Sequence, residues 1–372
     1  MRNSGRARWR SPLVIGLLIG RGASTFGQPR IETGNYQQNA SFLSRRFLTD
    51  AKNVGAMTDD FVRKAYELYK VRLLFPNGGL LNSDGTLDHA PFSANIFLEH
   101  VNAYEHAKGT MFTLMPYLNA YSFQDAAHAA NLRVNLEDRA VRAHIVAECA
   151  KYVSASVPGS YVRGSKRVFD GIVLDIEPGG DPAFLASLKT LLAELRTSFL
   201  RMGLANKKIG FAAPQYTERV PKPNWGWDSS DYHSVARYID YVIAMTYDSG
   251  LKDESKYQPW MKDQTTHILR AVSGATRDID TAHPSPTNAV RVLIGLPGFQ
   301  TVSKAHDPDV ENVAHGAPGI LEALALLRSQ DRTTLNYFQG VTMYTHDGGS
   351  ADSNFARYDK DWSEWKKYWL DK

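Results

Sequence analysis

The chain has 372 residues, of which 43% are hydrophobic and 22% are charged, as is usual for a folded globular protein. A net charge of +4 is small for this length and gives no basic stripe for a phosphate backbone, so we expect no nucleic-acid partner. The single cysteine, Cys149, excludes an intrachain disulfide and a cysteine-rich zinc site, and its helical spacing predicts a buried structural role.

The N-terminal residues have the layout of a secretory signal peptide. A short apolar run over residues 12–20 follows four arginines and precedes small residues around 23–27; the arginines are Arg2, Arg6, Arg8 and Arg10. This order predicts a signal peptide over residues 1–27 and a secreted or periplasmic protein, with a disordered extension as the alternative. The run is too short to span a bilayer, and no later segment approaches ~20 apolar residues, so we expect no membrane span.

From about residue 57, amphipathic helical stretches alternate with short β-rich runs, a pattern typical of parallel βα units. The clearest runs are Phe169–Glu177, Ile209–Tyr216, Tyr241–Asp248, Arg291–Phe299 and Gly340–His346. Earlier runs at Tyr69–Phe75 and Thr110–Tyr117 predict the second and third strands, and the first is expected somewhere between Asn39 and Met57. Without a linker or a break in composition, the pattern predicts one (β/α)8 barrel domain over residues 31–372.

The helices between these runs carry recognisable start signals. Asp181 followed by Pro182 predicts an N-cap with proline at the first helical position, and Asn135 is expected to cap the helix that contains Cys149. Further helices are predicted at Ser230–Ile239, Pro259–Ser273, Pro318–Ser329 and Asp359–Leu370. The last carries Trp362, Trp365 and Trp369 at helical spacing, which favours packing against the barrel over a polysaccharide-binding surface.

The run that ends at Glu177 places two carboxylates on one face of a strand. Because side chains alternate, Asp175 and Glu177 share a face with Val173, and the apolar neighbours Ile172, Leu174 and Ile176 share the other. In a barrel the carboxylates would point inward at the C-terminal end, where barrel active sites lie. Two charges about 5 Å apart repel by roughly 3 kcal/mol, so one carboxyl is expected to stay protonated. A protonated carboxyl beside an ionised one is what glycosidic bond cleavage needs. The alternative is a structural role, in which salt bridges to lysine or arginine on the helices hold the two carboxylates.

With these carboxylates in place, the sequence resembles the family 18 glycoside hydrolases, the chitinase group. Asp170, Asp175 and Glu177 fill three of the four acidic places of the family's Asp-x-x-Asp-x-Asp-x-Glu signature. The family's Met-x-Tyr-Asp motif is matched by Met245, Thr246, Tyr247 and Asp248. Two further runs resemble the fifth and seventh family strands, Phe211–Gln215 and Ile294–Pro297. The resemblance covers about residues 165–347.

The resemblance implies substrate-assisted catalysis, in which the sugar's own 2-acetamido oxygen attacks the anomeric carbon. On this basis Glu177 would be the general acid and base, Asp175 would orient the acetamido group, and Tyr247 would donate a hydrogen bond to the acetamido oxygen. The expected substrate-binding group is Asp170, Met245, Asp248, Tyr344, Gln215, Trp225 and Trp227. Asp170 is out of phase with the inward set, so anchoring the strand is its more natural role, and Trp225 and Trp227 could equally cover the barrel rim.

Two positions depart from the family pattern. Val173 stands at the second acidic place, which puts the rate and the pH optimum in doubt, and Tyr344 stands where the family often has a tryptophan. The expected function is hydrolysis of β-1,4-linked N-acetylglucosamine-containing glycans, with no cofactor and no metal. The open alternatives are a catalytically silent chitin- or sugar-binding barrel and a peptidoglycan-directed, muramidase-like hydrolase. The choice among chitin, peptidoglycan and N-glycan substrates, endo or exo action, and oligomeric state do not follow from the sequence.

Overall fold

The structure is a computed structural model, and it describes residues 38–44, 46–49, 54–88, 94–121, 134–177, 182–219, 223, 225–275, 290–299, 302–344 and 363–372. Residues 31–372 form one compact unit. The predicted signal peptide, Asp181 and Trp362 lie outside the described residues. No helix in the described part of the chain is both long enough and apolar enough to cross a membrane.

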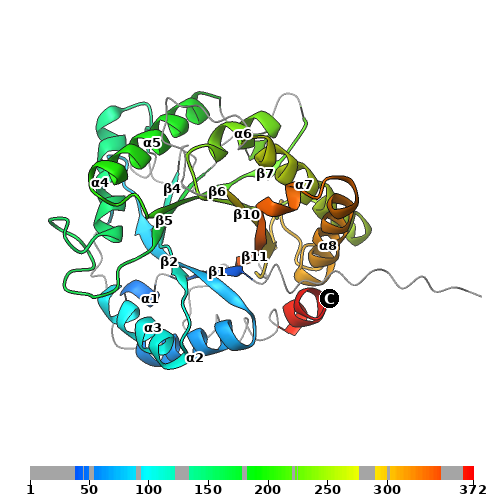
Figure 1. The fold of residues 1–372 in the computed structure, drawn as a ribbon. Coiled ribbons are helices and arrows are strands. Elements are labelled where there is room, and N and C mark those ends of the chain that lie inside the picture. The colour runs from blue at the N-terminus through cyan, green and yellow to red at the C-terminus, as the bar shows by residue number, and fades with distance from the viewer. Residues whose placement is uncertain are drawn as a thin grey trace, which may run out of the picture. The chain divides into compact units, whose positions relative to one another are not determined.

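Eight parallel strands close into a barrel, which confirms the predicted (β/α)8 fold (Figure 1). The strands are β1 (Asn39–Leu43), β2 (Val71–Leu80), β4 (Tyr117–Tyr121) with the short β3 (Thr113–Leu114), β5 (Gly171–Glu177), β6 (Lys208–Ala213), β9 (Tyr241–Ala244), β10 (Arg291–Pro297) and β11 (Phe338–Tyr344). The ring closes because β1 pairs with both β11 and β2. A two-stranded pair, β7 (Gln215–Tyr216) and β8 (Gly226–Trp227), lies outside the barrel sheet.

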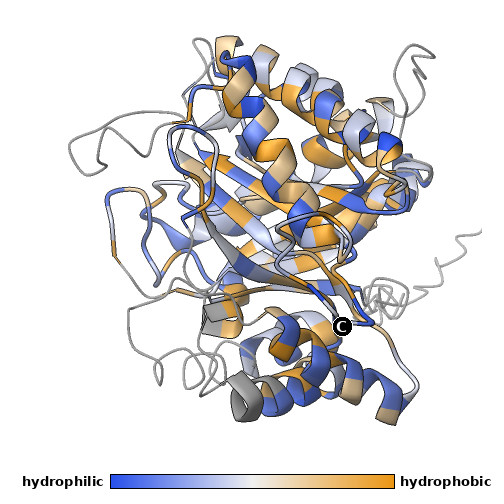
Figure 2. Cartoon of the chain, turned by 90° about the vertical axis from the view of Figure 1, so that its left-hand side faces the viewer, coloured by the Kyte–Doolittle hydropathy of each residue, from blue (hydrophilic) through white to orange (hydrophobic). Residues whose placement is uncertain are grey.

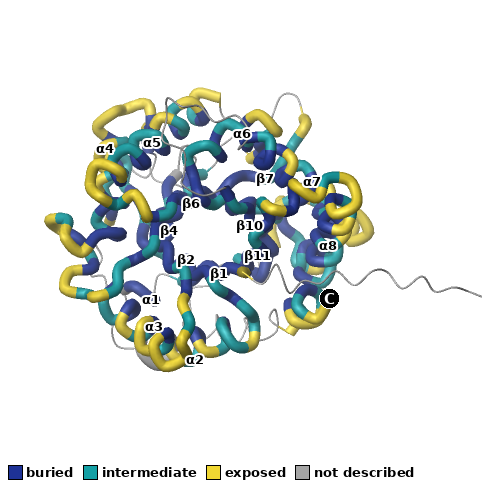
Figure 3. The backbone as a smooth tube through the Cα atoms, in the orientation of Figure 1, coloured by how far each residue is buried: buried dark blue, intermediate teal, exposed yellow. Residues whose placement is uncertain are grey.

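Helices surround the barrel and follow its strands in chain order (Figure 1). They are α1 (Arg46–Thr49), α2 (Val54–Glu67), α3 (Ala94–Lys108), α4 (Arg139–Val153), α5 (Pro182–Arg201), α6 (Ser229–Ala236), α7 (Glu254–Ala275), α8 (Val313–Gln330), η3 (Thr334–Tyr337) and η4 (Lys366–Leu370). The strands are largely buried and the outward faces of the helices are exposed (Figure 3). Figure 2 shows apolar and polar residues interleaved along the helices, as expected for elements that bury one face.

Two separate apolar clusters hold the fold together. The larger lies between the strands and the helices and contains the outward-facing Ile172, Leu174 and Ile176, together with the buried Cys149. The smaller fills the barrel interior, with members on six of the barrel strands or the segments that adjoin them: Ala40, Phe42, Leu73, Phe75, Met115, Tyr117, Val173, Ile243 and Leu293. Side chains alternate between the two faces of each strand, so consecutive residues belong to different clusters.

Several predicted boundaries shift in the structure. Asn135 does not cap α4, so that prediction is wrong; the N-cap is Asp138, whose side chain accepts a hydrogen bond from the Ala140 amide at 2.7 Å, while Asn135 accepts from the Glu137 amide one turn earlier. Helices α7 and α8 begin five residues before the prolines that were expected to start them, at Glu254 and Val313.

The C-terminal tryptophans pack against the barrel as expected. Trp365 and Trp369 are fully buried, and their ring N–H groups donate to the Tyr69 carbonyl at 3.3 Å and to Asn39 Oδ1 at 3.1 Å. Asn39 begins β1 and Tyr69 lies just before β2, so these bonds join the C-terminal segment to the first two strands of the barrel.

Candidate active site

A cavity of about 370 Å³ opens at the C-terminal ends of the barrel strands. Its walls come from five barrel strands, β1, β4, β5, β6 and β11. The loops that follow β7, β9 and β10 complete them. The lining residues are Phe42, Asn119, Ala120, Asp175, Glu177, Ala212, Trp225, Met245, Tyr247, Asp248, Phe299, Ser303 and Tyr344. The C-terminal end is where barrel enzymes hold their active sites, so this cavity is the candidate site.

Asp175 and Glu177 both line the cavity from the end of β5. Beneath them Val173 lies in the interior apolar cluster, where a neighbouring Gly210 leaves room: a Cβ at Gly210 would come within 3.1 Å of the Val173 side chain. The two carboxyls therefore stand on an apolar floor with no deeper carboxylate at position 173. Such surroundings disfavour the charged form of both groups.

Burial is the main influence on both carboxyls. It raises the pKa of Asp175 to about 7. Burial also raises the pKa of Glu177 well above its usual range, and the negative charges of Asp175 and Asp248 raise it further. Since the Asp175 charge raises the pKa of Glu177, ionisation of Asp175 favours a protonated Glu177, which gives an acid beside a carboxylate.

Tyr247 reaches the cavity from the loop that follows β9. The predicted strand over Tyr241–Asp248 ends earlier, at Ala244, and Thr246 then fixes the turn by donating its hydroxyl to the Gly295 carbonyl at 2.6 Å. Gly295 is required here, because a Cβ on it would approach the Ala244 carbonyl oxygen to 2.6 Å and the Tyr247 ring to 3.1 Å. The absence of a side chain at Gly295 lets the Tyr247 ring enter the site.

Aromatic rings hold Tyr247 in place. Its ring stacks on Tyr344 with centroids 5.6 Å apart and an interplanar angle of 10°, and it meets Phe299 edge-on at 5.9 Å. Burial raises the pKa of the Tyr247 hydroxyl, as do Tyr344 and the nearby carboxyls, so this group is a neutral hydrogen-bond donor at any physiological pH. Tyr344 itself packs edge-on against Phe42 at 5.7 Å, which ties the cavity wall to β1.

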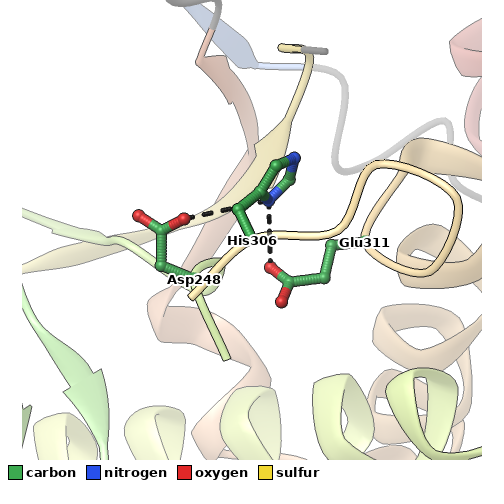
Figure 4. A group of neighbouring side chains, drawn as sticks. All are labelled: Asp248, His306 and Glu311. Atoms are coloured by element: carbon green, nitrogen blue, oxygen red, sulfur yellow. Dashed lines mark hydrogen bonds and ion pairs between the residues drawn. The ribbon is translucent and has the colours of Figure 1, made fainter. Parts of the chain in front are cut away.

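One group in the described part of the chain has donor atoms spaced as a metal site would need. Asp248, His306 and Glu311 bring a ring nitrogen and two carboxylate oxygens within 4.8 Å of one another (Figure 4). His306 and Glu311 are buried and lie in the segment between β10 and α8, whereas Asp248 is exposed at the cavity.

The cavity contains most of the residues predicted from the sequence. Alongside Asp175, Glu177 and Tyr247 it is lined by Met245, Asp248, Tyr344 and Trp225. Trp225 is 44% exposed, as a residue that meets a ligand must be. Gln215, on β7, is not among the lining residues.

Two residues that were predicted to bind substrate, Trp227 and Asp170, lie away from the cavity. Trp227 is fully buried and stacks on Phe211 at 5.4 Å with an interplanar angle of 3°, so it is a core residue and no sugar platform. Asp170 precedes β5 at the opposite end of the barrel, where its carboxylate accepts hydrogen bonds from the Leu114 amide at 2.8 Å and from Arg167 at 3.1 Å. Asp170 anchors the strand, as its phase along the chain suggested.

The structure adds lining residues that the sequence did not indicate, of which Asn119 is the most informative. It pairs in register with Asp175 across β4 and β5, so both side chains enter the barrel at the same level. The third strand was expected to end at Tyr117, two residues too early to include it. Alternation carried on from Tyr117, which also faces the interior, would have found Asn119.

Comparison with known proteins supports the fold. Neither a protein-family model nor a curated protein matches the sequence. Among solved structures, the chain is similar to a fungal endo-β-N-acetylglucosaminidase of glycosyl hydrolase family 18, with a TM-score of 0.50 and 13% identity over 89% of this chain and 98% of that one. It is also similar to the catalytic domain of the psychrophilic chitinase B from Arthrobacter TAD20, with a TM-score of 0.50 and 14% identity over 90% and 96%. The chain thus shares the fold of these two proteins.

Proposed function

We propose that this protein is a glycoside hydrolase that cleaves β-1,4-linked glycans containing N-acetylglucosamine, with Glu177 as the general acid. The observation that carries the proposal is the pair of carboxyls at the end of β5, Asp175 and Glu177, which share one cavity and in which the Asp175 charge raises the pKa of Glu177. An acid that is protonated near neutrality beside a carboxylate is the combination that glycosidic cleavage requires. The barrel fold and the motif order support the same assignment.

The reaction follows from the positions of the three groups. Glu177 gives its proton to the oxygen that leaves, while the substrate's acetamido oxygen attacks the anomeric carbon from the other side and forms a cyclic oxazolinium ion. Asp175 in its ionised form stabilises the positive charge, and the Tyr247 hydroxyl donates to the acetamido group. Glu177, now a carboxylate, takes a proton from water as the water opens the ring, which regenerates the acid and retains the anomeric configuration.

The apolar residue beneath the two carboxyls, Val173, affects the pH at which this reaction can proceed. With Val173 in place of an acid, Asp175 has no carboxyl below it with which to share a proton. Its pKa of about 7 therefore places its ionisation in the working pH range, and the enzyme needs a pH near or above neutrality to carry the carboxylate that the intermediate requires. We further propose that the protein acts outside the cytoplasm, on the strength of the charged, apolar and small-residue order of residues 1–27.

A panel of three polymers tests the proposal: chitin oligomers, peptidoglycan fragments and an N-glycan core, each followed by NMR of the first product anomer. We expect turnover of at least one substrate with release of the β-anomer. Binding without turnover on all three would make the protein a sugar-binding barrel. Efficient cleavage of oligomers that lack the 2-acetamido group would instead indicate a mechanism that uses protein carboxylates alone.

A further inference from the structure

Asp248 occupies the cavity edge in an unusual backbone conformation. Its φ angle is 56°, in the left-handed region that side chains other than glycine seldom adopt. Such a conformation persists only where the surroundings hold it, and it is found most often at functional sites. The conformation of Asp248 therefore depends on the contacts that the neighbouring residues make with the loop after β10.

The segment after Asp248 is tied to the loop that follows β10. The Ser249 amide and hydroxyl both donate to Glu311 Oε1, at 3.0 and 2.7 Å, and the Gly250 amide donates to the Ala305 carbonyl at 2.7 Å. Glu311 is 1% exposed, so its carboxylate is a fixed internal anchor. These three bonds hold the backbone on the C-terminal side of Asp248.

His306 links this anchor to Asp248 itself. Its Nδ1 lies 3.3 Å from Glu311 Oε2 and 3.8 Å from Asp248 Oδ1 (Figure 4). Its Nε2 lies 3.3 Å from the Phe299 carbonyl oxygen. Both nitrogens of this fully buried ring therefore face acceptor oxygens.

His306 also supports the aromatic wall of the cavity. Its ring lies 4.0 Å from the Phe299 ring, centroid to centroid, and Phe299 in turn meets Tyr247 edge-on. One buried side chain thus touches two residues that line the cavity, Phe299 and Asp248.

We propose that His306 and Glu311 are positioning residues, which hold the Asp248 carboxylate at the cavity edge so that its charge acts on Glu177. This deepens the proposed function and rests on it for its catalytic meaning. The charged and titratable groups around Glu177 are Asp175 on the same strand, Tyr247 and Asp248 on the loop after β9, and Tyr344 at the end of β11. Of these, Asp248 has a carboxylate oxygen 3.8 Å from Nδ1 of the buried His306, which belongs to another loop.

A divalent cation is the competing occupant of the same three donor atoms. His306 and Glu311 already have hydrogen-bond partners at both ring nitrogens and at both carboxylate oxygens, so the pair is satisfied without a metal. That favours a hydrogen-bonded network over a cation site.

The test follows the titration of Glu177 by NMR in protein labelled with ¹³C at glutamate carboxyls, with E177Q to assign the signal. We expect D248N and H306Q each to lower the titration midpoint of Glu177, by about one pH unit, and the double variant to show no greater shift than D248N alone. The matched control is H100Q, which removes a histidine paired with Asp59 on the outside of the barrel and should titrate like the wild type. This readout does not depend on turnover, so it stands even where the proposed activity fails.

Three results would overturn the proposal: a wild-type midpoint in H306Q, a wild-type midpoint in D248N, or a stoichiometric metal ion found by elemental analysis whose removal shifts Glu177. Thermal melts report whether H306Q folds. Should it not fold, H306F serves in its place, because phenylalanine keeps a ring against Phe299 while removing the nitrogen contacts to Asp248 and Glu311. A midpoint lowered in H306F supports the positioning role, and an unchanged midpoint in a folded H306F contradicts it.

Discussion

Asn119 and Asp175 are in-register partners on adjacent strands, and each has one buried side-chain oxygen without a hydrogen-bond partner in the described part of the chain. Two buried acceptors that lie side by side and line a cavity are costly unless something donates to them. A bound sugar, with its acetamido N–H and its hydroxyls, supplies such donors. The relationship therefore gives the site a chemical preference for a ligand rich in donors.

The first prediction concerns Asn119. We expect Asn119→Ala to lower kcat/KM by about tenfold, the loss typical of one hydrogen bond to substrate in a buried site. The variant should fold normally, because the residue lies at the cavity. Steady-state kinetics on a fluorogenic chito-oligosaccharide measures the effect, and unchanged kinetics would show that the Asn119 oxygen does not meet the substrate.

Glu177→Gln tests the general acid. The amide keeps the size of the side chain but has no proton to give, so kcat should fall by roughly a thousandfold on substrates with a poor leaving group. A substrate whose leaving group needs no protonation should lose much less in the bond-cleavage step, seen as a pre-steady-state burst. Wild-type turnover by this variant would remove Glu177 from the mechanism.

The pH dependence of kcat/KM follows from the two raised pKa values. The active form has Asp175 ionised and Glu177 protonated, so the rate should rise as pH passes through about 7 and fall again once Glu177 loses its proton. A pH series in buffers of constant ionic strength checks this profile. An acid limb near pH 4 would mean that Asp175 keeps the ordinary pKa of an exposed aspartate.

The same shifts predict a stability gain for Asp175→Asn. A carboxyl whose folded-state pKa is raised binds its proton more tightly in the folded state, so wild-type stability declines as pH rises from about 4 through 7. The variant lacks this decline. We expect it to be more stable than the wild type by on the order of 1–2 kcal/mol at pH 8 and equal to it near pH 3, as measured by denaturant unfolding.

Tyr247→Phe removes a hydroxyl while keeping the ring that stacks on Tyr344. Loss of one donor to a developing charge should lower kcat by roughly a hundredfold. The control is Tyr161→Phe, which removes a tyrosine hydroxyl bonded to Glu148 on α4, away from the cavity, and should leave kcat unchanged. Similar kinetics for the two variants would argue against a donor role for Tyr247.

Trp225 and Trp227 form a matched pair two residues apart. Trp225→Ala should raise KM for longer oligosaccharides with little change in stability, since that side chain lines the cavity and is partly exposed. Trp227→Ala should cost about 3–5 kcal/mol of folding free energy, because its ring stacks on Phe211 in the core. Calorimetry and kinetics on both variants check the contrast, and the reverse pattern would contradict the assignment.

The sequence by itself determined the barrel and the strand that carries Asp175 and Glu177. Strands alternate with period two, so the order of residues 172–177 already assigns Asp175 and Glu177 to one face and the apolar trio to the other. The spacing between β-rich runs likewise requires a helix between consecutive strands. Both signals are local, and local geometry is what a single sequence carries most directly.

Other features depended on contacts between distant parts of the chain. The strand β1 could not be placed from sequence, because all five of its residues are buried and no alternation is visible; it is defined by pairing with β2 and β11. Trp225 and Trp227 cannot be told apart in the sequence. Only the stacking of Trp227 on Phe211 shows that Trp227 belongs to the core, whereas Trp225 lines the cavity. His306 and Glu311 meet Asp248 across about 60 residues of chain, since the two loops belong to neighbouring strands of a closed barrel. No periodicity encodes such proximity, so the tertiary fold alone decided it.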